Sequence, residues 1–329
     1  MRKQTFGRLG GFFSLVLAMA LGYALPAMAS AEGSFDRTLN VTGAVMLEVT
    51  TGSGNIHVQT GNSGQVHVVG HIRAGSWWGG DNAEERVKRI EANPPIQQSG
   101  NDIRIGHIDD PELRRNISIS YEITVPAEAQ VRAHSGSGNA AVQGVRGPLE
   151  IESGSGNLQV TDLGGAVHAE TGSGNVEIDR VNGSVQAKTG SGDIHASAIG
   201  GGFEGSTGSG HVVLQQTSPG AVRVETGSGG MELRGVRGSL EAQAGSGDIR
   251  AEGDPSGAWS LRTGSGGVQL KLASGAGFDL SARTSSGSIV VAQPVTVQGA
   301  IGKKEIHGKV RGGGVSVQVE TGSGDIEIE

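Results

Sequence analysis

Apolar and polar residues alternate over short stretches that recur at a nearly constant spacing through most of the chain. One repeat carries Val176, Ile178 and Val181, followed by Val185 and Ala187, with mostly polar residues between them. A period of two is typical of a β-strand with one buried face and differs from the 3.6-residue period of an amphipathic helix. The pattern therefore predicts two short strands and two turns in each repeat, with one row of aliphatic side chains pointing inward.

A Gly-Ser-Gly triplet marks the same turn in each repeat, and successive triplets are 18 or 19 residues apart. The triplets begin at Gly136, Gly154, Gly172, Gly190, Gly208, Gly227, Gly245 and Gly264. One repeat cannot bury its own apolar row, so the repeats must stack and pair their strands in parallel. We therefore predict an all-β fold, a single-stranded parallel β-solenoid (β-helix) with coils of about 18 residues and a small N-terminal strand-plus-helix cap.

An Asn or Asp residue follows the triplet in many repeats. The six that we single out are Asn139, Asn157, Asn175, Asp193, Asp248 and Asp325. Both residue types tolerate left-handed backbone and form hydrogen bonds to nearby main chain, so their recurrence predicts a structural turn ladder. A calcium-binding β-roll is the alternative, but its turns recur every nine residues, and neutral Asn or Gly would leave most sites short of negative charge. We expect no metal ion.

Residues 34–133 depart from the repeat. Residues 81–91 predict a short helix, because acidic residues stand in its first turn and basic residues follow, and Pro94 ends it. Residues 96–105 predict a hairpin and residues 117–125 a strongly alternating strand. We interpret 34–133 as an N-terminal β cap over an otherwise exposed parallel edge, and 134–329 as the repeat β-solenoid.

The N-terminus predicts an export signal. Arg2, Lys3 and Arg8 precede an apolar stretch over 12–25, and Ala27-Met28-Ala29 provides small residues for cleavage. We predict a signal peptide over 1–29 and a protein exported to the periplasm or to the cell surface and medium, with no transmembrane segment after cleavage. Retention of the signal as an anchor is the alternative. The chain has no cysteine, which excludes disulfides and a lipid-anchored cysteine.

Composition and charge narrow the function classes. Glycine accounts for 59 of 329 residues and aromatic residues for only 3%, which fits a thin aliphatic core with many turns better than an enzyme pocket. Removal of residues 1–29 takes away three basic residues and no acidic one, so the formal net charge falls from −7 to −10. An acidic surface argues against a nucleic-acid partner and against attachment to anionic lipid.

Several motifs together resemble a known family. They are the ITVP segment at 123–126, the Val131 to Asn139 entry into SGSGN, the recurrent T-G-S-G-[ND]-[IV] turns, and a C-terminal run from Gly302 to TGSGDIEIE. Nearly all of 34–329 is similar to the bacterial DUF4097 family of candidate adhesins. The resemblance implies a parallel β-solenoid that is exported or membrane-attached, and it implies no catalytic residues.

Motifs that would indicate catalysis or cofactor binding do not occur. The sequence contains no Gly-x-Ser-x-Gly elbow and no phosphate-binding loop, and we expect no catalytic residues and no cofactor. His57, His67 and His71 come nearest to a metal cluster, but a solvated strand face explains them more simply. A polysaccharide-active β-helix enzyme would need clustered carboxylates and aromatic platforms. Outside the predicted signal peptide, Trp77-Trp78 is the only pair of adjacent aromatic residues, and we interpret it either as a cap on the first coil or as a contact loop.

Three irregularities interrupt the repeat: insertions at Thr217–Gly220 and Asp254–Gly257, and a longer step over Leu272–Phe278. Insertions in solenoids gather on one face, which is often the binding face; neutral drift at a solvated corner is the alternative. We predict a non-enzymatic adhesin or interaction scaffold whose partner is an envelope protein or a surface glycan. A self-assembling spacer is the alternative, because Asp325–Glu329 would leave the C-terminal edge of the solenoid uncovered and available for self-association.

Overall fold

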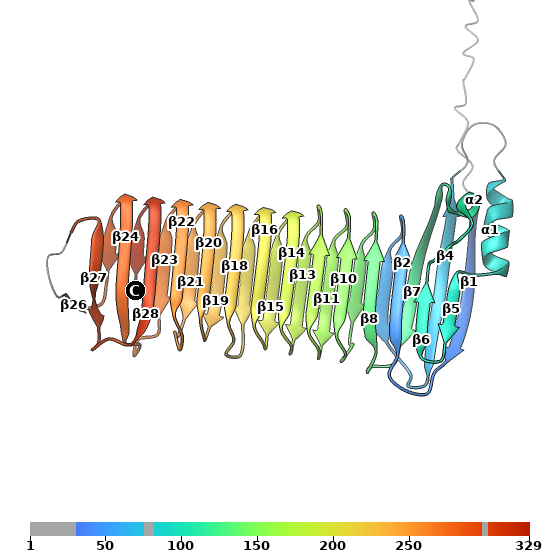
Figure 1. Ribbon diagram of the computed structural model, residues 1–329, viewed down its shortest axis with the longest axis horizontal. Coiled ribbons are helices and arrows are strands. Elements are labelled where there is room, and N and C mark those ends of the chain that lie inside the picture. The colour runs from blue at the N-terminus through green and yellow to red at the C-terminus, as the bar shows by residue number, and fades with distance from the viewer. Residues whose placement is uncertain (1–30, 76–81, 298–301) are drawn as a thin grey trace, which may run out of the picture.

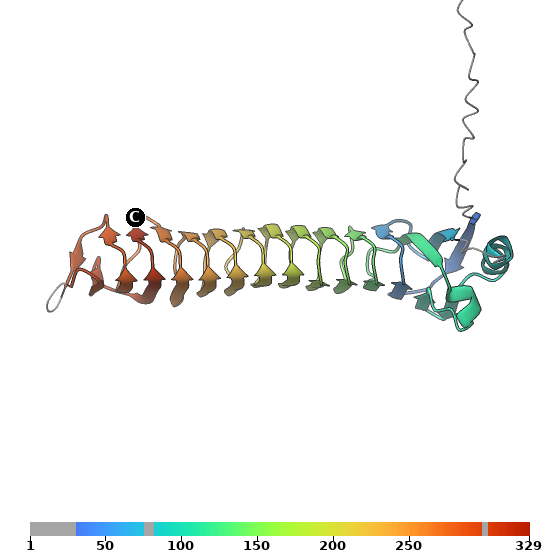
Figure 2. The same cartoon turned by 90° about the horizontal axis from the view of Figure 1, so that it is seen from above.

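A computed structural model describes residues 31–75, 82–297 and 302–329. The predicted signal peptide and the Trp77-Trp78 pair lie outside these residues. The described chain forms a long rod of two β-sheets with a helix at its N-terminal end (Figure 1). Viewed from above, the two sheets form facing layers joined by turns at both sides (Figure 2). The prediction of an all-β parallel solenoid is confirmed.

The first sheet, sheet A, has 14 strands among the described residues. In spatial order they are β1 (Ala31–Asn40), β4 (Gln65–Ala74), β7 (Ile117–Val125), β3 (Ile56–Thr60), β9 (Ala140–Gln143), β11 (Leu158–Leu163), β13 (Val176–Val181), β15 (Ile194–Ile199), β17 (Val212–Gln216), β19 (Met231–Val236), β21 (Ile249–Gly253), β23 (Val268–Leu272), β29 (Ile326–Ile328) and β25 (Ile289–Val291).

The second sheet, sheet B, has 15 strands in the same part of the chain. In spatial order they are β26 (Val295–Thr296), β27 (Glu305–Val310), β24 (Phe278–Ser286), β28 (Val315–Ser323), β22 (Trp259–Ser265), β20 (Leu240–Ser246), β18 (Val222–Ser228), β16 (Phe203–Ser209), β14 (Val185–Ser191), β12 (Val167–Thr171), β10 (Leu149–Ser153), β8 (Gln130–Ser135), β2 (Met46–Thr51), β6 (Asp102–Ile105) and β5 (Ile96–Ser99).

Each coil consists of one strand from each sheet. The chain leaves a sheet B strand through the Gly-Ser-Gly corner, forms a sheet A strand, and returns to sheet B through a second corner of three to five residues. Neighbouring coils pair in parallel and in register, so Val167 lies beside Val185 and Val176 beside Ile194. The inward side chains are buried and form one continuous aliphatic core along the rod. Its largest member, Trp259, donates its indole N–H to the Gly238 carbonyl at 2.9 Å.

The N-terminal end of the rod is built from residues before 126. Strands β2 and β3 pair in parallel with β8 and β9, so they continue the coil stack. Beyond them lie the antiparallel strands β1, β4 and β7 in sheet A and the hairpin β5–β6 in sheet B. Helix α1 (Ala83–Ala92) packs on β1 and β4, and a one-turn helix α2 (Pro111–Arg114) precedes β7.

The C-terminal coil is placed differently from our prediction. Strand β29 lies between β23 and β25, and β28 lies between β22 and β24. Asp325–Glu329 is therefore inside the stack, and the prediction that it forms an uncovered edge is wrong. The reason is that β27 pairs antiparallel with β24 on the side away from β22, which leaves only the inner side of β24 for β28. The longer step over Leu272–Phe278 spans the width of this inserted coil.

Candidate functional site

A long groove crosses the outer face of sheet B where its strands begin. It has a volume of about 1030 Å³ and extends over eight successive coils, from Gln130 on β8 to Ser260 on β22. Small residues line the groove at the position immediately before most of these strands: Pro148, Ala166, Ser184, Gly202, Ala221, Ser239 and Ala258. The next outward position on each strand carries mostly longer side chains, so a hollow forms along the rod axis beside that row.

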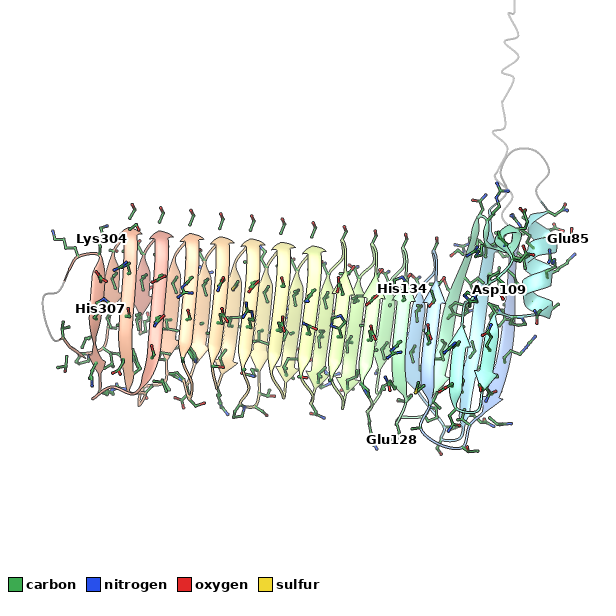
Figure 3. The ribbon with its side chains drawn as sticks, viewed as in Figure 1. Glu85, Asp109, Glu128, His134, Lys304 and His307 are labelled. Carbon is green, nitrogen blue, oxygen red and sulfur yellow. The ribbon has the colours of Figure 1, made fainter. Side chains whose placement is uncertain are left out.

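The longer side chains beside the groove form pairs along the rod. Arg132 contacts Glu150 at 3.1 Å, the His168 ring is hydrogen-bonded to Gln186 at 2.7 Å, and Arg223 contacts Glu241 at 2.9 Å. In-register stacking explains the pairing, because equivalent positions in adjacent coils lie about 4.8 Å apart. The groove therefore presents alternating donors and acceptors beside a floor of small residues. Figure 3 shows side chains projecting along this rod, with His134 on the face and Glu128 at the second corner.

Two of the predicted insertions border this groove. Thr217–Gly220 and Asp254–Gly257 both lie in the second corner, immediately before the groove residues Ala221 and Ala258. They lengthen the turns on one side of the rod. The structure thus places them beside this groove.

The six predicted turn residues stand in one column at the Gly-Ser-Gly corner. The side-chain Oδ1 of each residue accepts a hydrogen bond from the main-chain N–H at the same position in the next coil. The pairs, at 2.7–2.9 Å, are Asn139 with Asn157, Asn157 with Asn175, Asn175 with Asp193, Asp193 with His211, Asp248 with Gly267, and Asp325 with Ser288. Each of these bonds links a side chain in one coil to the main chain of the neighbouring coil. Asn139, Asn157, Asn175 and Asp193 form one continuous run of such bonds, whereas Asp248 and Asp325 each form a separate bond. Gly230 and Gly267 supply no side chain to this column.

A second column, of buried hydroxyls, was not predicted from the sequence. The residue before each triplet is Ser or Thr in nearly every coil, and its hydroxyl donates to a glycine carbonyl in the neighbouring coil at 2.8–3.2 Å. The donors are Ser135, Ser153, Thr171, Thr189, Thr207, Thr226, Thr263, Thr284 and Thr321. In the sequence, the recurrent Thr before Gly-Ser-Gly could have indicated this column. These bonds satisfy carbonyls that would otherwise be buried without a partner.

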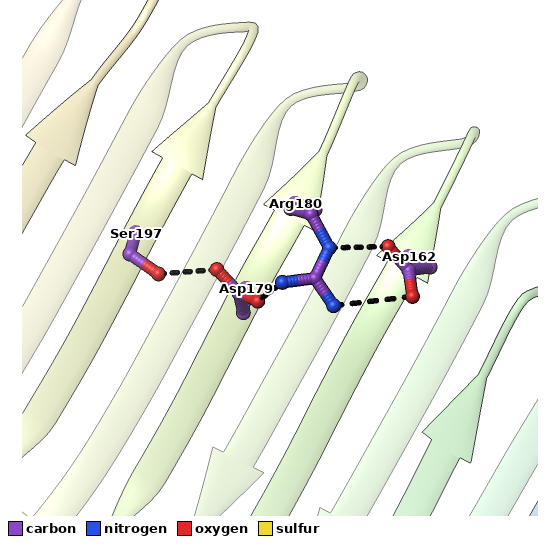
Figure 4. Close-up of polar contacts among 4 residues, drawn as sticks. All are labelled: Asp162, Asp179, Arg180 and Ser197. Atoms are coloured by element: carbon purple, nitrogen blue, oxygen red, sulfur yellow. Dashed lines mark hydrogen bonds and ion pairs between the residues drawn. The ribbon is translucent and has the colours of Figure 1, made fainter.

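A charged group on sheet A joins three coils (Figure 4). The Arg180 guanidinium holds Asp162 through two bonds, at 2.5 and 3.1 Å, and also contacts Asp179, which accepts from the Ser197 hydroxyl at 2.5 Å. Asp162 and Arg180 have left-handed backbone, with φ of 59° and 54°. The bonds from Arg180 lower the pKa of Asp162 below its usual value. This group is exposed and internally paired, which marks it as a surface clamp between coils.

The three histidines considered as metal ligands do not converge. His67 is paired with Asp36 at 2.7 Å, and His71 lies 3.6 Å from Glu122. Neighbouring strands supply these carboxylates, so they could not be read from sequence proximity. Within the described residues, no group of three or more His, Asp or Glu side chains could hold a metal ion.

No helix in the described part of the chain is long and apolar enough to cross a membrane. The stack of coils and its axial groove define a parallel β-solenoid with an extended surface. A sequence profile of the Toastrack DUF4097 family matches residues 45–202 and again 201–329. This chain belongs to that family. The predicted family resemblance is confirmed.

Several solved bacterial structures are similar to the chain. A candidate cell adhesion protein of Clostridium sporogenes is 11% identical over 91% of this chain and 99% of its own, with a TM-score of 0.25. A candidate adhesin of Bacteroides fragilis is 12% identical over 90% and 97%, with a TM-score of 0.32. A candidate lipid-binding protein of Parabacteroides distasonis is 11% identical over 90% and 97%, with a TM-score of 0.40. Among curated proteins, none matches.

Proposed function

We propose that this protein is a non-enzymatic, exported adhesin-like protein whose axial groove on sheet B binds an envelope protein or a surface glycan. The observation that carries the proposal is the groove itself, about 1030 Å³ in volume and continuous over eight coils. A hollow of this length suits an extended partner better than a compact small molecule. The predicted export signal places such a partner outside the cytoplasm.

The chemistry of the groove supports binding rather than catalysis. Its charged side chains are largely paired with one another, as Arg132 is with Glu150 and Arg223 with Glu241. A catalytic pair of carboxylates would instead be held close together with perturbed protonation. Alternating donors and acceptors along a shallow hollow can contact many units of a long partner weakly, and the contacts add up through multivalency.

The test is to fill the groove. Ala166→Tyr with Ala221→Tyr places two large side chains on exposed floor positions, while Ala141→Tyr adds one at an outward position of sheet A. We expect the groove variant to bind intact source cells at least tenfold more weakly than the unmodified protein, and the Ala141 variant to bind normally. Equal binding by all three proteins, measured with a fluorescent label, would disprove a role for the groove.

A further inference from the structure

The column of turn residues at the Gly-Ser-Gly corner has two empty positions. In a filled position, a side-chain oxygen accepts from the main-chain N–H one coil away, as Asn175 does from Asp193 at 2.9 Å. Gly230 and Gly267 lack a side chain at this place. The main-chain N–H groups of Asp248 and Asp325 consequently have no hydrogen-bond acceptor within the described chain.

A hollow of about 620 Å³ opens at the first empty position. It is lined by His211, Gly230 and Asp248 at the corner and by the outward Val213, Glu232 and Arg250 on sheet A. The Nδ1 atom of His211 accepts from the Gly230 N–H at 3.0 Å, so a neutral ring carries its proton on Nε2. Asp248 Oδ1 already accepts from the Gly267 N–H at 2.8 Å. The Asp248 N–H is therefore a donor without a partner at this hollow, and it calls for a ligand that offers an acceptor.

The order of residues in the column indicates the charge of that acceptor. Along the rod the column carries four Asn residues, then Asp193, His211, Gly230, Asp248, Gly267, Asp325 and Ser288. No two aspartates are adjacent, which avoids like charges about 4.8 Å apart. The Gly230 position adjoins Asp248, and the Gly267 position lies between Asp248 and Asp325. A neutral amide oxygen, which Asn supplies elsewhere in the column, fits both positions better than a carboxylate.

The spacing of the empty positions indicates the kind of polymer. They are two coils apart, so a ligand along the rod must offer two amide oxygens about 10 Å from each other. In an extended peptide, successive carbonyls point to opposite edges, so those that face the rod recur every ~6.8 Å and do not match this spacing. A glycan with acetamido groups offers hydroxyl donors between its amides, and those hydroxyls can bond to Asp248. In a β-1,4-linked chain, every second acetamido group faces the same side.

We propose that the corner between Gly230 and Gly267 binds an N-acetylated glycan. Two of its acetamido oxygens accept the N–H groups of Asp248 and Asp325, and a sugar hydroxyl between them donates to Asp248. The glycan takes the places that asparagine side chains hold in other coils. This corner lies at the opposite end of the sheet B strands from the axial groove, so its test does not depend on the groove.

The experiment replaces both glycines with Asn, the residue that occupies the equivalent position in other coils. An added Cβ would lie 3.4 Å from its nearest neighbours at Gly230 and at Gly267, which is ordinary contact, and neither glycine has a positive φ. Gly230→Asn with Gly267→Asn should therefore fold and complete the column. Gly275→Asn is the matched control, because it adds the same side chain at a turn with nothing within 4 Å.

The probe is a hexamer of β-1,4-linked N-acetylglucosamine. Its binding is measured by NMR titration, through the backbone amide resonances of Asp248 and Asp325. We expect saturable shifts of both resonances in the unmodified protein and in the Gly275 variant. The filled variant should bind at least tenfold more weakly while unfolding at the same or a higher temperature. The de-acetylated hexamer should not compete.

Three results would overturn the proposal. One is the absence of saturable shifts with the N-acetylated hexamer, which would leave these N–H groups to water. Another is undiminished binding by the filled variant. The third is equal binding of an Asn-Gly repeat peptide, which would assign the corner to a polypeptide partner. Binding to source cells through the groove could persist in each case, so the two proposals fail separately.

Discussion

At the scale of single residues, the buried hydroxyl column shows how the corner tolerates so much glycine. Thr189 donates to the Gly174 carbonyl at 2.8 Å, and Thr207 donates to the Gly192 carbonyl at 2.9 Å. Each bond ties the end of one sheet B strand to the Gly-Ser-Gly corner of the neighbouring coil. The threonines thus fix a turn that glycine alone would leave flexible. Ala244 interrupts the column, and it is 7% exposed.

Restoring the column at this position should stabilise the protein. By the repeat, the hydroxyl introduced by Ala244→Thr would donate to the Gly229 carbonyl, and we expect the free energy of unfolding to rise by about 1 kcal/mol. Urea denaturation measures this change. Ala242→Thr is the matched control, since it buries a hydroxyl away from the corner, and it should destabilise by about 1–3 kcal/mol. A loss of stability in the Ala244 variant would contradict this role for the column.

The exposed clamp on sheet A gives a prediction about protonation. Bonds from Arg180 lower the pKa of Asp162, so this carboxylate stabilises the fold above its unfolded-state pKa of about 3.9. That contribution is lost as the pH falls through the lower folded-state value. In Arg180→Gln we expect the pKa of Asp162 to rise toward its usual value in an NMR titration of the carboxyl carbon. Arg223→Gln, on the other sheet, should leave it unchanged.

At the scale of elements, both ends of the rod place strands out of chain order. At the N-terminal end, β2 lies between β8 and β6 although residues 52–101 separate β2 from β6 in the chain. At the C-terminal end, the last coil occupies a place that the chain passes over between β23 and β24. Identical repeats alone would permit a stack in simple chain order. The antiparallel pairing of β24 with β27 selects the observed order, because it occupies the outer side of β24.

Disulfide trapping can test this order, because the chain has no native cysteine. Gln318 on β28 lies in register with Ser260 on β22 and with Ser281 on β24. Ser260→Cys with Gln318→Cys should therefore cross-link under mild oxidation. Ser260→Cys with Ser281→Cys should not, since strands two places apart are about 9.6 Å from each other and a disulfide needs Cα atoms within about 7 Å. Mass spectrometry detects the cross-link in each variant. A cross-link between positions 260 and 281, with none between 260 and 318, would indicate a stack in chain order.

At the scale of the whole molecule, the two ends of the rod are unequal. Helix α1 covers the N-terminal end, where Glu91 accepts from the main-chain N–H of Ser34 on the edge strand β1 at 2.8 Å. At the other end, β25 pairs with β29 on one side, and no described strand pairs with its other side. Val290 at its centre is 55% exposed. Self-association of rods, if the protein acts as a spacer, therefore belongs to β25 and not to Asp325–Glu329.

We expect light scattering to show association at high protein concentration and Val290→Lys to reduce it. A lysine on an edge strand disfavours pairing with another edge. Met46→Lys is the matched control, because Met46 is the other strongly exposed large hydrophobic residue in the described part of the chain, at 50%, and it lies near the opposite end of the rod. Reduction by Met46→Lys alone would place the contact elsewhere.

The repeat could be predicted from the sequence because each coil contains the same pattern of alternating apolar residues and turn residues. Alternation of Val176, Ile178 and their neighbours requires one buried face, and glycine with Asn or Asp requires a turn. The same reasoning located the strand at 117–125, and the order of acidic and basic residues located a helix at 81–91, close to the observed Ala83–Ala92. These features depend on local sequence or on contacts with an identical neighbour, so the sequence by itself determined them.

Only the tertiary structure decided which coil lies beside which. Every coil offers nearly the same edges, so the alternation of side chains does not distinguish a neighbour in the chain from a distant one. The place of the last coil depends on the β24–β27 pairing, and the groove depends on small residues from seven coils aligning in one row. The empty positions at Gly230 and Gly267 likewise gain meaning only when their neighbours along the rod are known. Contacts between coils, which the repeat leaves open, decide the surface on which function depends.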